Sequence, residues 1–437
     1  MSPLSIVIVG AGLGGLSCAI QCRRQGLNVL VLERAPEILE IGAGIQVPPN
    51  AGRVLQTYGL IDDVRKHAIE IESLELRRYA DGSLLTERPV ATFGVPWFVI
   101  HRVDYHKVLW NEAKRLGTRL RTDAEVTDVD MLAGKVVLKS GEIITGDVIV
   151  GADGLWSVVR DKLLQSPSPP FETGDLAYRA TFTLEQLQAL NDPAVERLCG
   201  RHTVGLWMGP GKHCVFYPIR GGKVYNLVLL RPDNLPSDVR TVRGDIDEMK
   251  ESFRGWDPVV TKLLSCIDSV LKWKLFHHHE LETWQNHSTT LIGDSCHPTL
   301  PYQAQGAAMA VEDGAVLGLL LGKLQSREPT GPRSEHIKQV LLLFEKLRKH
   351  RTTVNVQGAV HNRWFYHLLD GEEQLDRDRA LKAVDWRSPN VTVYKWASPD
   401  YQSQLLGHDV LQEADKEFEL WWQTAHVLSN VNGLSRH

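Results

Sequence analysis

Three glycines near the start of the chain stand at a spacing that suits phosphate binding. Gly10, Gly12 and Gly15 follow the apolar run Ser5–Val9 and open a segment, residues 13–25, with helical periodicity. The first glycine permits a tight turn, the second allows the backbone to approach a pyrophosphate, and the third lets the helix pack closely against the strand. The start of that helix offers unpaired N–H groups and a partial positive charge. The stretch therefore predicts a dinucleotide site.

Glu33 strengthens this prediction. It ends the next apolar run, Asn28–Leu32, about 20 residues after the glycines, where an acid binds the hydroxyl groups of a ribose. The strand, turn and helix together form a βαβ unit of the length that the fingerprint requires. The alternative is a purely structural glycine turn.

Two later stretches have residues that suit a second and third contact with the same ligand. Asp153 stands in "GADG" after an apolar strand, although Asp153 or Ser157 could instead cap a helix. Asp294 follows another strand and could accept hydrogen bonds from a sugar-alcohol chain. The small residues from Gly306 to Ala308 open a helix whose N–H groups could face a polar ring.

In this order, the stretches resemble those of the single-component, FAD-dependent aromatic hydroxylases. The motifs are GxGxxG with an acid, His101-Arg102, "GADGLWSVVR" and "GDSCHPTLPYQAQGAAMAVEDG", and the resemblance covers most of residues 5–360. Salicylate hydroxylase and 6-hydroxynicotinate 3-monooxygenase are the most similar members. The resemblance implies tightly but non-covalently bound FAD, with NADH or NADPH as a transient co-substrate, since only one dinucleotide fingerprint is present.

The resemblance also assigns the contacts with FAD. Glu33 is expected at the adenosine ribose, Arg102 at the ribityl–phosphate region, and Asp294 at the ribityl chain or pyrophosphate. Asp153 is expected to stabilise the nucleotide fold and the path of NAD(P)H. The full set expected to bind FAD is Gly10, Gly12, Gly15, Glu33, Ala43, Gly44, Gln46, Arg102, Val126, Asp153, Asp294, Pro298, Gly306 and Ala307.

Three residues of the central region are expected at the substrate. The resemblance places Arg179 in "AYR" and Tyr217 in "FYP", and His213 lies four residues before Tyr217. On one strand this even spacing directs both side chains to the same face. They could bind or deprotonate a phenol, or pack together structurally; Arg179 could bind a carboxylate or form an interdomain ion pair. Gln46 stands where the hydroxynicotinate enzymes have histidine.

The expected reaction is NAD(P)H- and O2-dependent hydroxylation of an electron-rich ring through a flavin C4a-hydroperoxide. The substrate expected is a phenolic, salicylate-like acid, with or without decarboxylation. An alternative is dearomatisation or epoxidation of a phenol, indole or alkene in secondary metabolism. An alternative of another class is a non-catalytic nucleotide-binding or redox-regulatory protein.

Other histidines and cysteines favour structural roles. The residues His277 to His279 would alternate between strand faces and lack neighbouring acids, so we expect no metal site. His297 is expected to pack within its motif rather than to catalyse. Cys18 and Cys22 would share a helix face, which favours packing over a redox pair. Trp97, Trp207 and Trp364 could line an aromatic pocket or belong to the core.

The composition and length of the whole chain are consistent with an FAD-dependent hydroxylase. Its 437 residues, 43% hydrophobic, carry a net charge of −4 with mixed acids and bases, so we expect no nucleic-acid or membrane partner. We expect a cytoplasmic monomer or homodimer. The predicted fold is α/β, a Rossmann-like FAD-binding domain of the GR2 type with a parallel sheet (1–171 and 286–360). An inserted antiparallel sheet domain (172–285) and a C-terminal helical region (361–437) complete it.

Overall fold

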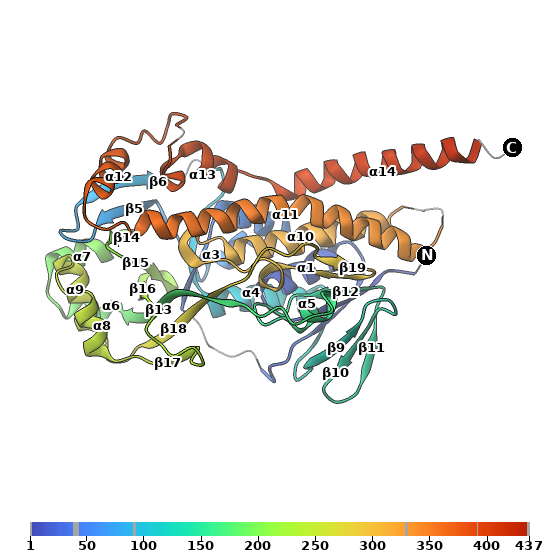
Figure 1. Ribbon diagram of the computed structural model, residues 1–437, viewed down its shortest axis with the longest axis horizontal. Coiled ribbons are helices and arrows are strands. Elements are labelled where there is room, and N and C mark those ends of the chain that lie inside the picture. Colours follow the sequence, from blue (N-terminus) through green and yellow to red (C-terminus); the bar gives the residue numbers. More distant parts are fainter. Residues whose placement is uncertain (1, 38–42, 91–92, 328–330, 391, 435–437) are drawn as a thin grey trace.

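A largely parallel sheet unites strands that are far apart in the sequence (Figure 1). The computed structural model describes residues 2–37, 43–90, 93–327, 331–390 and 392–434, with side chains up to residue 424. The strand order is β19 (Gln285–Asn286), β20 (Thr289–Leu291), β12 (Val148–Gly151), β1 (Ser5–Val9), β2 (Asn28–Leu32), β8 (Arg119–Arg121). Only the β19–β20 pair is antiparallel. Strands β1 and β12 are buried on both faces, which explains their continuous apolar runs.

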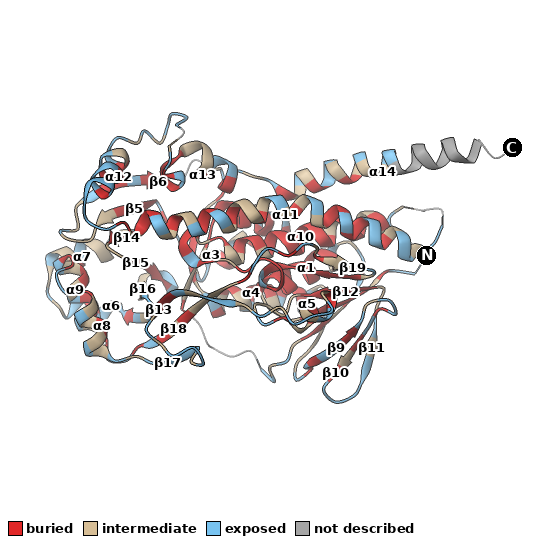
Figure 2. Cartoon of the chain, viewed as in Figure 1, coloured by how far each residue is buried: buried red, intermediate tan, exposed pale blue. Residues whose placement is uncertain are grey.

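Helix α1 (Leu13–Arg24) packs closely against α10 (Gly306–Gln325), and both are buried along most of their length (Figure 2). A Cβ atom on Gly314 or Gly318 of α10 would collide with α1, so the close approach depends on glycine. Cys18 and Cys22 lie buried on α1 as free thiols. Their burial supports the packing interpretation.

The second large sheet has eight strands. Their order is β17 (Thr241–Arg243), β18 (Leu271–His277), β13 (Phe171–Thr183), β16 (Val224–Pro232), β15 (Lys212–Ile219), β14 (Thr203–Gly209), β5 (Ser73–Arg78), β6 (Leu84–Pro89). All neighbours are antiparallel except β14 and β5. The stretch predicted as an insertion supplies six strands, and residues 73–89 supply the other two.

Two small sheets complete the strand structure. One contains β11 (Ile143–Thr145), β10 (Lys135–Leu138) and β9 (Val126–Asp130). The other contains β3 (Gly44–Val47), β7 (Phe98–His101) and β4 (Ala68–Glu70). Strand β3 contacts the eight-stranded sheet, because the N–H of Gly44 donates to Asn226 Oδ1 of β16 at 2.8 Å.

Helices pack against the six-stranded and the eight-stranded sheets. The shorter ones are α2 (Pro49–Tyr58), α3 (Ile61–Arg65), α4 (Arg102–Arg115), α5 (Val158–Leu163), α6 (Leu184–Gln188), α7 (Pro193–Cys199), α8 (Ile246–Ser252), α9 (Pro258–Ser265), α12 (Glu372–Lys382) and α13 (Pro399–Leu406). Short 3₁₀ turns are η2 (Arg220–Gly222), η3 (Gly293–Ser295), η4 (Pro301–Gln303) and η5 (Lys395–Ala397).

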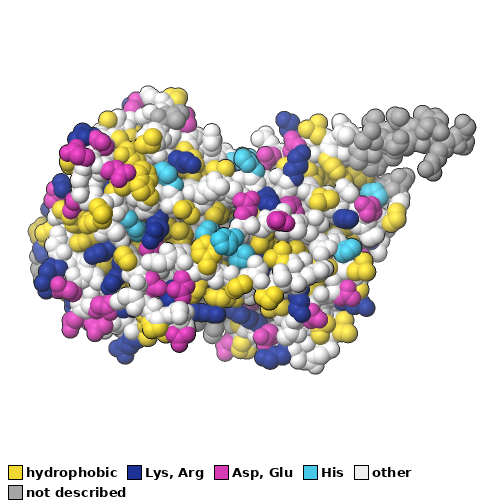
Figure 3. All heavy atoms as spheres, in the orientation of Figure 1, with side chains coloured by type: hydrophobic (Ala, Val, Ile, Leu, Met, Phe, Trp, Pro, Cys, Tyr) yellow, Lys and Arg dark blue, Asp and Glu magenta, His cyan; other side chains and the backbone are white. Residues whose placement is uncertain are grey.

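The C-terminal region is helical, as predicted. Helix α11 (Arg333–Tyr366) runs across the expected boundary at residue 360 and reaches both halves of the molecule (Figure 1). The first half of α14 (Val410–Leu434) packs against α10, with Phe418 buried and Lys323 paired with Glu419, and the helix then projects beyond the body (Figure 1). Acidic and basic side chains are interspersed on the face shown in Figure 3. Within the described ranges, no helix is both long and apolar enough to cross a membrane.

Candidate active site

The turn after β1 meets the ends of two other strands. Gly10 has a φ of +104°, a conformation that L side chains rarely adopt, and a Cβ there would collide with the carbonyl of Ala152 beyond β12. Ile292, which follows β20, donates its N–H to Gly151 O at 2.9 Å. Because the carboxyl ends of parallel strands share one edge, the three sequence motifs form one cradle there.

Two helices begin at this cradle without a side-chain cap. The N-cap residues Gly12 of α1 and Gln305 of α10 make no capping hydrogen bond, and neither first turn contains an acid. A Cβ on Gly12 would meet open space, so a ligand has room beside it. The unpaired N–H groups of α1 suit a pyrophosphate, and those of Gly306 and Ala307 suit a polar ring oxygen.

Glu33 is held in place at the end of β2. Its Oε2 accepts the N–H of Ala11 and its Oε1 accepts the N–H of Ala35, both at 2.9 Å. The carboxylate therefore lies beside the glycine turn, where a ribose diol would bind. His106 Nε2 lies 2.7 Å from Ala11 O and fixes the same turn from α4. The sequence analysis did not identify this histidine.

Arg102 and Asp294 supply opposite charges to the cradle. Arg102 begins α4, where its N–H donates to Ala43 O at 3.1 Å, and its side chain is exposed. Asp294 lies on η3 with an accessible side chain. Desolvation by the surrounding protein raises the pKa of Asp294, while the neighbouring His297 and Arg102 oppose this. Neither side chain forms a hydrogen bond with a described residue, so both remain available to a polar ligand.

Asp153 is a helix cap in this structure. Its Oδ1 accepts the Ser157 hydroxyl at 2.5 Å, and its Oδ2 accepts the N–H groups of Val158 and Val159 at 2.8 and 3.1 Å. Residues of the chain therefore occupy both carboxylate oxygens of Asp153. Val126 is buried on β9. Pro298 is buried, and its carbonyl lies 3.0 Å from His277 Nδ1.

The three predicted substrate residues lie on one face of the eight-stranded sheet. Arg179 of β13 lies opposite Val228 of β16, and Val228 lies opposite Val215 of β15. Val215 is two residues from both His213 and Tyr217, and alternate residues of a strand share a face. The predicted common face of His213 and Tyr217 is confirmed.

Tyr217 lies against the cradle. A Cβ on Gly44 would be 2.6 Å from Tyr217 Cε2, so the ring packs on the backbone of β3. Burial raises the pKa of Tyr217, and the charge of Arg179 opposes this. The Arg179 side chain is accessible along one side, yet desolvation and the repulsion of Arg102 lower its pKa, while Tyr217 opposes this. Arg179 makes no hydrogen bond or ion pair with a described residue, so the structure shows no interdomain ion pair within the described ranges.

His213 lines a small pocket, of about 50 Å³, beside the cradle. Its walls are mainly apolar, with residues that include Gln46, Leu74, Leu76, Trp97, Tyr302 and Gln303. His213 Nδ1 lies 2.7 Å from His367 Nε2. Burial and the nearby His367 lower the pKa of His213, so the imidazole is neutral at pH 7. Its Nε2 has no hydrogen-bond partner among the described residues.

Comparison with known proteins agrees with this geometry. A family model described as an FAD binding domain matches residues 4–328. The chain belongs to this family of FAD-dependent monooxygenases. The cradle fits FAD, since the uncapped α1 terminus suits the pyrophosphate, Glu33 suits the ribose, and the α10 terminus suits the flavin ring.

Relatives and solved structures extend this result. The chain is 39% identical over 424 residues to the FAD-dependent monooxygenase OpS4 of Beauveria bassiana, covering 94% of this chain and 97% of that protein. It is 36% identical over 332 residues to 3-hydroxybenzoate 6-hydroxylase 1 of Aquipseudomonas alcaligenes, covering 73% and 81%. A salicylate hydroxylase substrate complex has the same fold, with a TM-score of 0.78 and 24% identity over 95% and 98% of the two chains. The predicted FAD-dependent aromatic hydroxylase family and fold are confirmed.

Several residues around the flavoprotein's pocket were missed by the sequence analysis. His367 and Tyr302 adjoin His213, with ring centroids 5.0 and 5.2 Å away. The Tyr302 hydroxyl donates to Asp175 Oδ2 at 2.6 Å, and Arg363 Nη2 donates to Asp175 Oδ1 at 2.8 Å. Tyr302 lies within the motif that contains Asp294 and Pro298, but no motif marks His367, Asp175 or Arg363, because these side chains come together only when the end of α11 folds onto the sheet.

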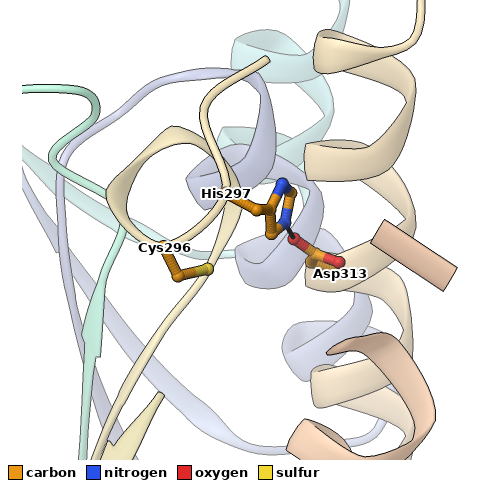
Figure 4. A group of neighbouring side chains, drawn as sticks. All are labelled: Cys296, His297 and Asp313. Atoms are coloured by element: carbon orange, nitrogen blue, oxygen red, sulfur yellow. Dashed lines mark hydrogen bonds and ion pairs between the residues drawn. The ribbon is translucent and has the colours of Figure 1, made fainter. Parts of the chain in front are cut away.

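His297 packs within its motif, as predicted (Figure 4). It comes from the segment after β20 and points to Asp313 of α10, with Nε2 2.5 Å from Oδ2. Arg348 Nε donates to Asp313 Oδ1 at 2.7 Å, and the Gly293 N–H donates to Oδ2 at 2.9 Å. Cys296 lies close enough to join a metal site with this pair. Because Arg348, Gly293 and His297 already occupy both carboxylate oxygens, the cluster has the character of a buried ion-pair network.

The other histidines and tryptophans lie in different environments. The three histidines do not alternate on one strand as expected, because β18 ends at His277. His277 contacts Pro298 O, His278 contacts Ser168, and the His279 ring lies 4.6 Å from that of Phe171. Trp97 lines the pocket. By contrast, Trp207 is buried, with Nε1 donating to Asp257, and Trp364 stacks on Tyr394 near the surface.

Proposed function

We propose that this flavoprotein hydroxylates a phenolic aromatic acid, of the hydroxybenzoate or salicylate type, ortho or para to its hydroxyl group. The observation that carries the proposal is the position of His213, a neutral base that lines a pocket beside the cradle and is paired with His367. The name of one relative, a 3-hydroxybenzoate 6-hydroxylase, supports the same substrate class.

The cofactor supplies the oxidising chemistry, and the protein prepares and positions the substrate. Bound FAD, reduced by NAD(P)H, supplies an electrophilic oxygen atom derived from O2. In the net reaction an aromatic C–H, O2, NAD(P)H and one proton become C–OH, water and NAD(P)⁺. The chain must make the ring electron-rich, orient it and exclude water.

Proton removal makes the ring electron-rich. The substrate hydroxyl transfers its proton to His213 Nε2, and the Nδ1 proton of His213 moves to His367 Nε2 across 2.7 Å. The side chain of His213 is buried, whereas that of His367 is partly exposed, so the proton leaves the pocket in the direction of solvent. Burial lowers the pKa of His367 to about 4, Asp175 opposes this and Arg363 adds to it, so His367 passes the proton on rather than retaining it.

Arg179 and Tyr217 stabilise the phenolate that results. The Tyr217 hydroxyl stays protonated because burial raises its pKa, so it can donate a hydrogen bond. Arg179 adds positive charge on the same face of the sheet. Such preorganised donors lower the barrier most in a site without water. Apolar walls, including Leu74, Leu76 and Trp97, exclude water from this pocket.

The test is a panel of hydroxybenzoates and pyridinols, with NADH or NADPH oxidation and product mass measured together. Gain of one oxygen supports hydroxylation, and gain of oxygen with loss of CO2 supports attack at the carbon bearing the carboxylate. A product that has lost its aromaticity, or peroxide without any oxygenated product across the panel, would contradict the proposal.

A further inference from the structure

Arg88 is a buried guanidinium without a counter-ion. It lies on β6 with 4% of its surface exposed, and both of its Nη atoms lack a hydrogen-bond partner. Burial alone lowers the pKa of Arg88 to about 9, and no carboxylate among the described residues opposes that effect. Burying an uncompensated charge destabilises a fold, so a residue of this kind points to a function.

The other buried arginines of the described chain each donate to a carboxylate or a backbone carbonyl, although Arg160 Nε and Arg348 Nη1 have no hydrogen-bond partner. Arg348 pairs with Glu312 and Asp313, and Arg377 pairs with Asp378. Arg160 donates to backbone carbonyls, among them Leu155 O at 3.0 Å. Arg88 therefore differs from the pattern that this chain otherwise follows.

Three aromatic rings surround Arg88 without satisfying its N–H groups. Its Cζ lies 5.3 Å from the Phe93 ring centroid, 5.6 Å from that of Trp97 and 5.8 Å from that of Trp386. Aromatic faces attract a cation. They leave the in-plane N–H donors of a guanidinium free, and those donors match a carboxylate in a bidentate pair.

Arg88 points to the side of the sheet that carries the substrate pocket. On β5, Leu74 lies opposite Arg88 and Leu76 lies opposite Thr86 of β6. Directly opposed residues project from the same face, and Leu74, Leu76 and Trp97 all line the pocket. Trp97 Nε1 is itself buried without a partner. Arg88 is not itself a lining residue, but it contacts Trp97, which is, so N–H donors that no acceptor of the described chain satisfies lie directly behind this end of the pocket.

We propose that Arg88 binds the carboxylate of the aromatic acid, with Trp97 Nε1 as an additional donor, while the phenolic end of the ring faces His213. The inference rests on the proposed function in taking this pocket as the substrate site. It assigns the carboxylate to Arg88 rather than to Arg179, which then acts on the phenolate. Substrates must therefore carry an anionic group in addition to the reacting hydroxyl.

Binding to the FAD-loaded enzyme without NAD(P)H tests this assignment independently of turnover. The probes are 2,4-dihydroxybenzoate and resorcinol, which share a ring and differ by the carboxylate, and the readout is the change in flavin absorbance. We expect the wild type to bind the acid at least tenfold more tightly than resorcinol. Arg88→Met should abolish that preference and leave resorcinol binding within twofold. Exposed Arg254→Met is the matched control and should keep the preference.

Two results would overturn the inference: a wild type that does not prefer the acid, or an Arg88→Met variant that keeps the preference. Loss of the preference in Arg179→Gln but not in Arg88→Met would transfer the role to Arg179. An intact Arg88-dependent preference without any oxygenated product would instead contradict the proposed function and leave this inference standing.

Thermal unfolding separates recognition from structural support. Because Arg88 has no counter-ion, Arg88→Met should raise the melting temperature of the substrate-free enzyme. The acid should raise the melting temperature of the wild type more than that of Arg88→Met. A melting temperature lowered by several degrees in Arg88→Met would show that Arg88 supports the fold through its aromatic neighbours, and would overturn the inference.

Discussion

His213 of β15 and His367 at the end of α11 form a hydrogen bond of 2.7 Å between Nδ1 and Nε2. The two residues are 154 positions apart in the sequence, and the contact joins the substrate sheet to the C-terminal helices. Since one proton lies between the two nitrogens, His367 determines whether His213 can release a proton as it accepts another.

Replacing His367 should therefore impair proton removal. His367→Leu is expected to lower kcat at least tenfold with FAD content unchanged, and His367→Gln, which keeps an acceptor, should recover part of the activity. Because the neighbouring His367 lowers the pKa of His213, its removal should also raise that pKa. The acid limb of the kcat/KM profile should then move to higher pH, because protonated His213 cannot act as a base. An acid limb that stays in place would limit His367 to packing.

The charge of Arg179 and the hydroxyl of Tyr217, both on the same sheet face as His213, should affect turnover rather than cofactor binding. Arg179→Ala or Tyr217→Phe is expected to keep the FAD content of the wild type and to reduce turnover at least tenfold, measured as oxygenated product per NAD(P)H. Unchanged turnover in either variant would remove that residue from the active site.

Acidic residues of the cradle should determine flavin occupancy. Glu33→Ala removes the carboxylate held by Ala11 and Ala35, and Asp294→Ala removes an accessible carboxylate from η3. Both should lower the ratio of flavin absorbance to protein absorbance after purification, and should weaken rebinding of FAD. Glu196→Ala, on the exposed surface of α7, should match the wild type. Full occupancy in Glu33→Ala would contradict the assignment.

The buried ion-pair network under the cradle should control stability at acid pH. Burial opposes ionisation, but Arg351 and Arg348 lower the pKa of Glu312 to about 2, and His297 and Arg348 lower that of Asp313 to about 2. In the unfolded chain both carboxyls bind protons at higher pH, so stability should fall as pH drops from about 4.5 towards 2. Chemical denaturation across this range should show the loss.

Breaking the same network should be costly at neutral pH. Arg348→Met leaves two buried carboxylates with fewer counter-charges, and we expect a loss of about 3–5 kcal/mol in the free energy of unfolding. The triple variant that adds Glu312→Gln and Asp313→Asn should recover part of this loss. Lys349→Met, one residue along α11 and partly exposed, is the control. A loss below about 1 kcal/mol in Arg348→Met, the scale of a surface pair, would contradict this account.

Asp153 should affect the fold and not the chemistry. Asp153→Ala removes the acceptor for the Ser157 hydroxyl and for two N–H groups of α5. We expect a loss of about 1–2 kcal/mol in the free energy of unfolding, with unchanged kcat in the FAD-saturated enzyme. A large fall in kcat without a loss of stability would restore a direct role along the NAD(P)H path.

The sequence by itself determined the cofactor half of this protein. Gly10, Glu33 and Asp294 each stand at the end of an apolar strand, and parallel strands deliver their carboxyl ends to one edge, so local pattern was enough to predict the cradle. The common face of His213 and Tyr217 also followed from their even spacing, because a strand alternates its side chains.

Only the tertiary structure decided which residues complete the substrate pocket. His367, Tyr302 and Arg88 come from a helix end, a 3₁₀ turn and an edge strand that no local period relates. Likewise, only the folded chain shows that Asp153 accepts hydrogen bonds from Ser157 and from the first two residues of α5. Periodicity reports the direction of a side chain along its own element, whereas the pairing of charges and the burial of Arg88 depend on how separate elements pack in space.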